Sequence, residues 1–136
     1  MKNILLGFAL ISLVGCATPS GDMLNNKFDS AITTTQENIG YYTGSIGPYT
    51  ATLKINSDGT GYYCESMGSN QTDHYLKAKF TTEMFYASNG GRFKIVENNK
   101  EKIIVQNIYF GINTKYTLIK DDSLSRSAPF CEKQFK

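Results

Sequence analysis

Apolar and polar residues alternate in short runs along most of the chain after residue 38. From Tyr49 to Ile55 every second residue is apolar, which predicts a strand with one buried face. Asn56-Ser57-Asp58-Gly59 then supplies the residues that a tight turn requires. The returning run at 61–67 completes a predicted β-hairpin.

The same pattern predicts further strands in the rest of the chain, at residues 40–44, 75–80, 84–87, 92–96, 102–110 and 115–120. The run 102–110 is the most continuously apolar, so we expect it to be covered on both faces or to lie centrally. In 115–120, either Tyr116 and Leu118 or Thr117 and Ile119 face inward. No long segment has the helical period.

Strands at this short spacing, with turn residues between them, favour an all-β fold. We predict a small antiparallel meander of about eight strands, lipocalin-like, closed as a barrel or packed as a sandwich. A barrel of this size is just filled by its side chains or holds one small ligand. The β domain is expected at 39–136, and residues 121–136 are expected to trail from the last strand.

Residues 16–38 are rich in Thr, Asn, Asp and Gln and sustain no periodic pattern. They are predicted to be a disordered, flexible tether that spaces the domain from a surface.

The first residues of the chain have the features of a targeting signal. After the single charge of Lys2, the apolar run Ile4–Val14 is little more than half of the about 20 residues that a membrane-crossing helix needs. We therefore predict a signal peptide at 1–15. An ordinary secretory signal would end in an Ala-x-Ala-like pair, whereas this run ends in Leu13-Val14-Gly15-Cys16.

That ending is a lipobox and resembles the signal of bacterial lipoproteins. The resemblance implies that the Cys16 thiol carries a diacyl lipid, that the chain is cut before Cys16, and that the new amine is acylated with a fatty acid such as palmitate. Three acyl chains make an effectively permanent anchor. Ala17, where Asp would retain the protein in the inner membrane, implies the outer membrane, facing the periplasm or the cell surface.

Two cysteines, Cys64 and Cys131, remain after lipidation in a compartment that is kept oxidising. We expect them to form a disulfide, which in the chain-entropy model contributes about 4 kcal/mol. This bond would hold the otherwise loose C-terminal segment on the third strand. A redox pair is the alternative, but it would favour Cys-x-x-Cys spacing. Removing residues 1–15 lowers the net charge of +2 by one, and no basic block favours nucleic acid as a partner.

The sequence offers little catalytic chemistry. His74, the single histidine, follows Asp73, but neighbouring side chains on an extended chain point apart and no nucleophile accompanies them. A solvated loop histidine is the favoured interpretation. Because zinc needs at least three ligands, we expect no metal, no cofactor, no catalytic residue and no enzymatic activity.

Basic residues recur in the middle of the chain and are expected to point outward: Lys77, Lys79, Arg92, Lys94, Lys100 and Lys102. The favoured interpretation is a solvated sheet face, and the alternative is a docking surface for anionic headgroups or a protein.

Four features together resemble the YedD-type (LptY) outer-membrane lipoproteins: Gly40-Tyr41-Tyr42, the strand and turn at 51–59, Cys64, and Ser127-Ala128-Pro129-Phe130-Cys131. This resemblance implies an accessory protein bound to the lipopolysaccharide translocon. It carries over only the lipidated Cys16 and the disulfide pair.

A second resemblance is to the membrane-bound lysozyme inhibitors, which are small lipobox barrels with a Ser-Gly-x-Arg-Tyr-like loop. The corresponding loop here is Asn89-Gly90-Gly91-Arg92-Phe93, with Asn in place of the Ser. Asn89, Gly90, Gly91 and Arg92 are therefore a candidate partner-contact loop. The expected function is a non-enzymatic, outer-membrane binding module for an envelope protein complex; the alternatives are a lysozyme inhibitor and a lipocalin-like binder of a small hydrophobic ligand.

Overall fold

The computed structural model describes residues 28–29, 38–68, 71–108 and 113–136. The predicted signal peptide, Cys16 and most of the predicted tether lie outside these ranges. The described residues form eight strands and one short helix: β1 (Gly40–Ile46), β2 (Tyr49–Ile55), β3 (Thr60–Ser66), β4 (His74–Phe80), β5 (Met84–Ala87), β6 (Arg92–Asn98), β7 (Lys102–Asn107), β8 (Lys115–Lys120) and α2 (Pro129–Phe135).

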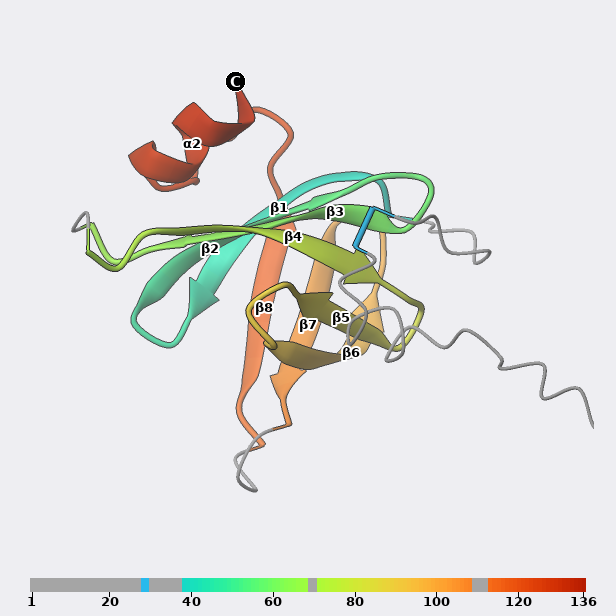
Figure 1. Cartoon of the computed structure of the whole chain (residues 1–136). Helices are drawn as coiled ribbons and strands as arrows, with labels where there is room; N and C mark the ends of the chain where they lie inside the picture. The colour runs from blue at the N-terminus through green and yellow to red at the C-terminus, as the bar shows by residue number, and fades with distance from the viewer. Residues whose placement is uncertain (1–27, 30–37, 69–70, 109–112) are drawn as a thin grey trace, which may run out of the picture.

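Neighbouring strands are antiparallel and follow one another in chain order, and β8 pairs with β1, so the sheet closes into a barrel (Figure 1). The predicted all-β meander is confirmed, and it takes the form of a barrel and not of a sandwich. The hairpin of β2 and β3 has the predicted turn, in which Thr60 N–H donates to Asp58 Oδ1 over 3.0 Å.

Alternate residues of the strands fill the interior. Leu53, Val105 and Leu118 are buried, and Tyr116 packs against the same core, which confirms the first of the two orientations considered for β8. Aromatic rings occupy much of the space beside them: Phe85 stacks on Phe93 with ring centroids 4.7 Å apart, and lies 5.6 Å from both Tyr63 and Phe80. Burying a large apolar side chain of this kind contributes about 1.5–3 kcal/mol.

Closure of the barrel depends on a close approach of β1 and β8. Tyr42 pairs with Lys120, and Gly44 pairs with Leu118. A Cβ atom at Gly44 would overlap the main-chain oxygen of Thr117, so a larger residue would push the two strands apart.

Of the two alternatives expected for residues 102–110, β7 is not covered on both faces, but it does lie between two neighbouring strands, β6 and β8. In β7 only Ile103 and Val105 are buried, whereas Ile104 and Gln106 are half-buried. A barrel has one interior, so each of its strands has one inward face. The strand ends at Asn107, and residues 109–112 lie outside the described ranges.

The disulfide holds residues 121–136 on the third strand, as expected, but the expectation that this segment is otherwise loose is wrong. The buried carboxylate of Asp121 accepts hydrogen bonds from the N–H groups of Ser125 and Arg126, which shapes a compact turn after β8. The chain then enters α2 at Pro129, which suits a first helical turn because its N–H would be unpaired there. In Figure 1, α2 lies against the layer formed by β1–β4.

The predicted disulfide is confirmed. Cys64 of β3 and Cys131 of α2 are joined with a Cα–Cα distance of 5.7 Å, and both side chains are fully buried. The bond therefore attaches α2 to the outside of the barrel.

Two described residues fall within the segment predicted as a tether. Phe28 is buried, and Asp29 forms an ion pair with Lys77 of β4 over 2.7 Å. At these two residues the chain lies against the barrel and is not spaced away from it.

Candidate functional site

His74 begins β4, where it pairs with Glu65 of β3, and does not lie in a loop as predicted. Its side chain is exposed. Asp73 faces a cleft of about 380 Å³ beside α2, and its Oδ1 atom is buried without a hydrogen-bond partner among the described residues. Nowhere in the described ranges do three His, Cys, Asp or Glu side chains gather closely enough to hold a metal ion.

The candidate partner-contact loop forms the turn between β5 and β6. Gly90 has a φ of +93°, a conformation that favours glycine, and the N–H of Gly91 donates to Asn89 Oδ1 over 3.0 Å. Asn89, Gly90 and Arg92 are exposed. The loop is an ordered, exposed turn, and its contact with a partner stays a prediction.

The six basic residues expected to point into solvent do not behave alike. The prediction is wrong for Lys79, whose side chain is only 1% exposed. Alternation assigns a residue to the outer side of the barrel, but it does not say whether another segment covers that side. Lys100, in contrast, is exposed and lines a pocket at one end of the barrel.

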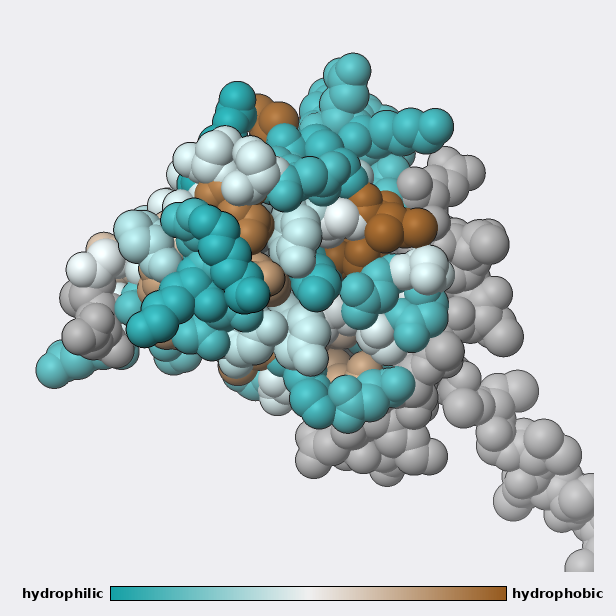
Figure 2. All heavy atoms as spheres, turned by 90° about the horizontal axis from the view of Figure 1, so that it is seen from above, coloured by the Kyte–Doolittle hydropathy of each residue, from teal (hydrophilic) through white to brown (hydrophobic). Residues whose placement is uncertain are grey.

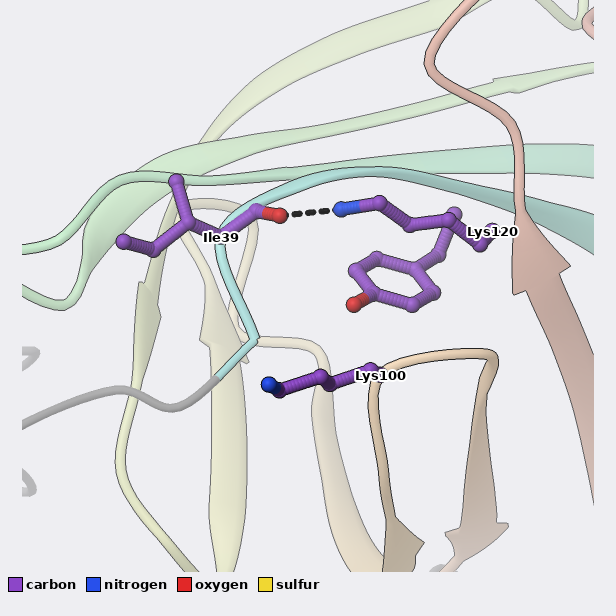
Figure 3. A pocket seen from close by; sticks show the side chains of 4 residues that line it. Ile39, Lys100 and Lys120 are labelled. Carbon is purple, nitrogen blue, oxygen red and sulfur yellow. Dashed lines mark hydrogen bonds between the residues drawn. The ribbon is translucent and has the colours of Figure 1, made fainter.

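That pocket, termed the mouth pocket, has a volume of about 230 Å³ and is lined by Ile39, Tyr42, Lys100 and Lys120 (Figure 3). Three separate segments supply these residues: the start of β1, the turn between β6 and β7, and the end of β8. Closure of the barrel brings the segments together, because Tyr42 and Lys120 face one another across the β1–β8 seam.

The hydroxyl of Tyr42 is a polar group of the mouth pocket that side-chain packing does not require. Its side chain is 0% exposed, and its hydroxyl has no hydrogen-bond partner in the described part of the chain. Leaving a buried hydroxyl unpaired costs about 1–3 kcal/mol. Burial raises the pKa of Tyr42, and the negative charge of Asp122 raises it further. The hydroxyl therefore stays protonated and is able to donate a hydrogen bond.

Lys120 holds its ammonium group over the Tyr42 ring, 4.8 Å from the ring centroid. The same Nζ donates to the carbonyl of Ile39, drawn as a dashed line in Figure 3, and lies 3.3 Å from Asp122 Oδ1. Gly40 leaves room for this arrangement, because a Cβ atom there would overlap both Lys120 and Asp122. Its φ of +117° also favours glycine.

A second candidate site lies on the outer side of β1–β4. The ring of Phe135, in α2, meets Tyr41 and Tyr75 edge-on at centroid distances of 5.2 and 5.4 Å. Tyr75 stacks on Tyr62 at 4.9 Å, and Lys54 Nζ lies 5.7 Å from the centroid of Tyr41. All five side chains are half-buried. Tyr41, Tyr62, Tyr75 and Phe135 are termed the aromatic face.

Figure 2 views the molecule from the side that carries α2. Hydrophilic side chains cover most of this view, and hydrophobic ones appear in a few separate patches. Tyrosine suits an interface because its ring offers contact area and its hydroxyl offers a hydrogen bond.

Comparison of the chain with protein-family models, with curated proteins and with solved structures finds no match. Among the described residues, no helix has the length and apolar character needed to cross a membrane. The geometry of the two sites therefore has to carry the functional argument.

Sequence reasoning did not single out Tyr42 or Lys120. Alternation assigns Tyr42 to the core like any other tyrosine of a strand, and it gives no information on whether the hydroxyl finds a partner. Gly40, at the start of β1, is the one local signal, since a glycine before two tyrosines allows a close approach of another segment.

Proposed function

We propose that this protein is a non-enzymatic, lipid-anchored binding module of a bacterial outer membrane, and that its partner is another protein of the envelope. The lipobox at Cys16 supports the anchor. The disulfide between Cys64 and Cys131 supports an oxidising compartment, because such bonds are rare in the cytosol.

The aromatic face is the observation that carries the proposed partner. Tyrosine is enriched at the centres of protein interfaces, because it presents a large, rigid, amphipathic surface at a small cost in side-chain entropy. Here the tyrosine rings are held by Phe135, and the helix that bears Phe135 is held by the disulfide. The rings are thus ordered before any partner arrives, which lowers the entropic cost of binding.

The two other functions expected from the sequence have less support. A lipocalin-like carrier needs an open interior, whereas Phe80, Phe85 and Phe93 pack against one another in the core of the barrel. A lysozyme inhibitor of the resembled kind uses a loop serine, and Asn89, which replaces it, accepts the hydrogen bond that shapes its own turn.

Site-specific photocrosslinking in intact cells tests the proposal. A benzophenone amino acid replaces Tyr62 on the aromatic face, and in a matched control it replaces Lys115, an exposed residue of β8. We expect a discrete adduct with one envelope protein from position 62 and none from position 115. The absence of an adduct at position 62, or the same adducts from both positions, contradicts the proposal.

A further inference from the structure

We propose that the mouth pocket is an oxyanion site that binds the phosphate of a phosphate monoester. The proposal is independent of the protein partner inferred above, because the mouth pocket and the aromatic face have no residue in common.

The hydroxyl of Tyr42 indicates that the mouth pocket holds a ligand. Folding buries it without a hydrogen-bond partner among the described residues, although a phenylalanine would fill the same space at a lower cost. A ligand that offers an acceptor oxygen would remove this cost. Since Tyr42 lines the pocket and its hydroxyl stays protonated, an acceptor oxygen bound in the pocket would give this hydroxyl a partner.

The charge of the mouth pocket favours an anionic ligand. Lys100 and Lys120 both line it, from different strands of the barrel. Lys120 is already paired with Asp122, but the side chain of Lys100 forms no ion pair or hydrogen bond with the residues that the structure describes. The described residues that line the pocket thus bring two ammonium groups and no carboxylate, and Asp122 offsets the charge of Lys120 alone. The remaining positive charge favours an anion over a cation or a neutral ligand.

A phosphate monoester is the anion that best matches these donor groups. A phosphate monoester has three terminal oxygens and nearly two negative charges, so it can accept hydrogen bonds from one hydroxyl and two ammonium groups together. Lysine binds phosphate as a point charge and needs no bidentate geometry. A carboxylate has one charge and two oxygens and satisfies this donor set less completely.

The size of the pocket limits the ligand. A volume of about 230 Å³ lies below the about 300–1,000 Å³ typical of pockets that enclose a whole small molecule. The pocket therefore takes the phosphate end of a larger ligand. Ile39, with 52% of its surface exposed, provides apolar contact for the group that the phosphate esterifies.

A titration with phenyl phosphate tests the proposal. The full chain, with ¹³C-labelled tyrosine, is purified in detergent and placed in nanodiscs of phosphatidylcholine. We expect a saturable shift of the Tyr42 ring signals with phenyl phosphate, and weaker binding of benzoate. No saturable shift at Tyr42, or tighter binding of benzoate, overturns the proposal.

Single variants then assign the contacts. Tyr42→Phe removes one hydrogen bond to a charged group and should weaken binding about tenfold, and Lys100→Met should weaken it by a similar factor. Both are followed by calorimetry. Asp122→Asn removes the competing carboxylate and should tighten binding, whereas Lys115→Met on β8 is the matched control and should change nothing. If Tyr42→Phe and Lys100→Met bind phenyl phosphate as the wild type does, the assignment is wrong.

The phosphate has two natural sources, a soluble ester and a lipid headgroup, and nanodiscs that contain phosphatidic acid separate them. A shift of the Tyr42 signals in these nanodiscs without added phenyl phosphate supports the site with a lipid headgroup as its ligand. A shift with phenyl phosphate alone supports it with a soluble ester. No shift in either case overturns it.

Discussion

At the scale of single residues, Tyr42 combines two properties that folding alone does not favour. It is fully buried, and its hydroxyl has no partner in the described part of the chain. The ring contributes to stability, because it packs in the core and lies under the ammonium of Lys120. The cost is therefore confined to one oxygen atom, which suggests that this atom serves a ligand and not the fold.

Because the ring is stabilising and only the hydroxyl is costly, the effect of Tyr42→Phe on stability can be predicted. The variant keeps the ring and its cation–π contact and removes only the unpaired hydroxyl, so the free energy of unfolding should rise by about 1 kcal/mol. Urea denaturation followed by circular dichroism measures the change. Tyr49→Phe, at a half-buried site at the opposite end of β1 and β2, is the control and should stay within about 0.5 kcal/mol of the wild type. A less stable Tyr42→Phe variant would show that the hydroxyl has a structural role.

At the scale of elements, α2 is held to the barrel by one covalent bond and a few ring contacts. The helix is short, and Cys131 is its one buried residue. Helices of this length are marginal by themselves in water. Its position therefore depends on the disulfide to β3 and on the contacts of Phe135 with Tyr41 and Tyr75.

Replacing both cysteines in the variant Cys64→Ala/Cys131→Ala should lower the free energy of unfolding by about 4 kcal/mol, as the chain-entropy model gives for a loop of 67 residues. The measurement is the urea midpoint of the oxidised wild type against the variant. Cleavage after the basic residues of the C-terminal segment by trypsin should also become faster, because α2 loses its attachment. An unchanged midpoint would show that ring contacts alone hold the helix.

At the scale of the whole molecule, the proposed function combines an anchor with a rigid domain that has two independent sites. The closed barrel leaves no strand edge unpaired among β1–β8, which protects a membrane-attached domain from edge-to-edge association. The aromatic face lies on the outer side of β1–β4, and the mouth pocket lies at one end of the barrel. A protein partner and an anionic ligand can therefore bind at the same time.

The proposed lipid anchor predicts that fatty acid is attached to Cys16. Radioactive palmitate should be incorporated into the wild-type protein in growing cells and should be absent from the Cys16→Ser variant, because Cys16 is the proposed site of acylation. Fractionation should place the wild type with the outer membrane. Ala17→Asp is the companion variant, and it should be labelled equally but move to the inner membrane. Equal labelling of wild type and Cys16→Ser would remove the anchor from the proposal.

Local chemistry determined much of this protein in advance. Alternation from Tyr49 to Ile55 and the turn residues Asn56–Gly59 specify the hairpin of β2 and β3 almost to its ends, because both depend on neighbours in the chain. The pairing of Cys64 with Cys131 was expected from the number of cysteines and from the compartment that the signal predicts. These inferences needed no knowledge of which strand lies beside which.

Tertiary structure alone decided the rest. Whether the meander closes depends on the approach of β1 to β8, and with it the meeting of Tyr42, Lys100 and Lys120 from segments far apart in the sequence. The burial of Lys79 and the docking of α2 likewise depend on what covers the outside of the barrel. Alternation tells which side of a strand a residue faces, but the partner of that side is set by long-range register and closure, which a local pattern does not contain.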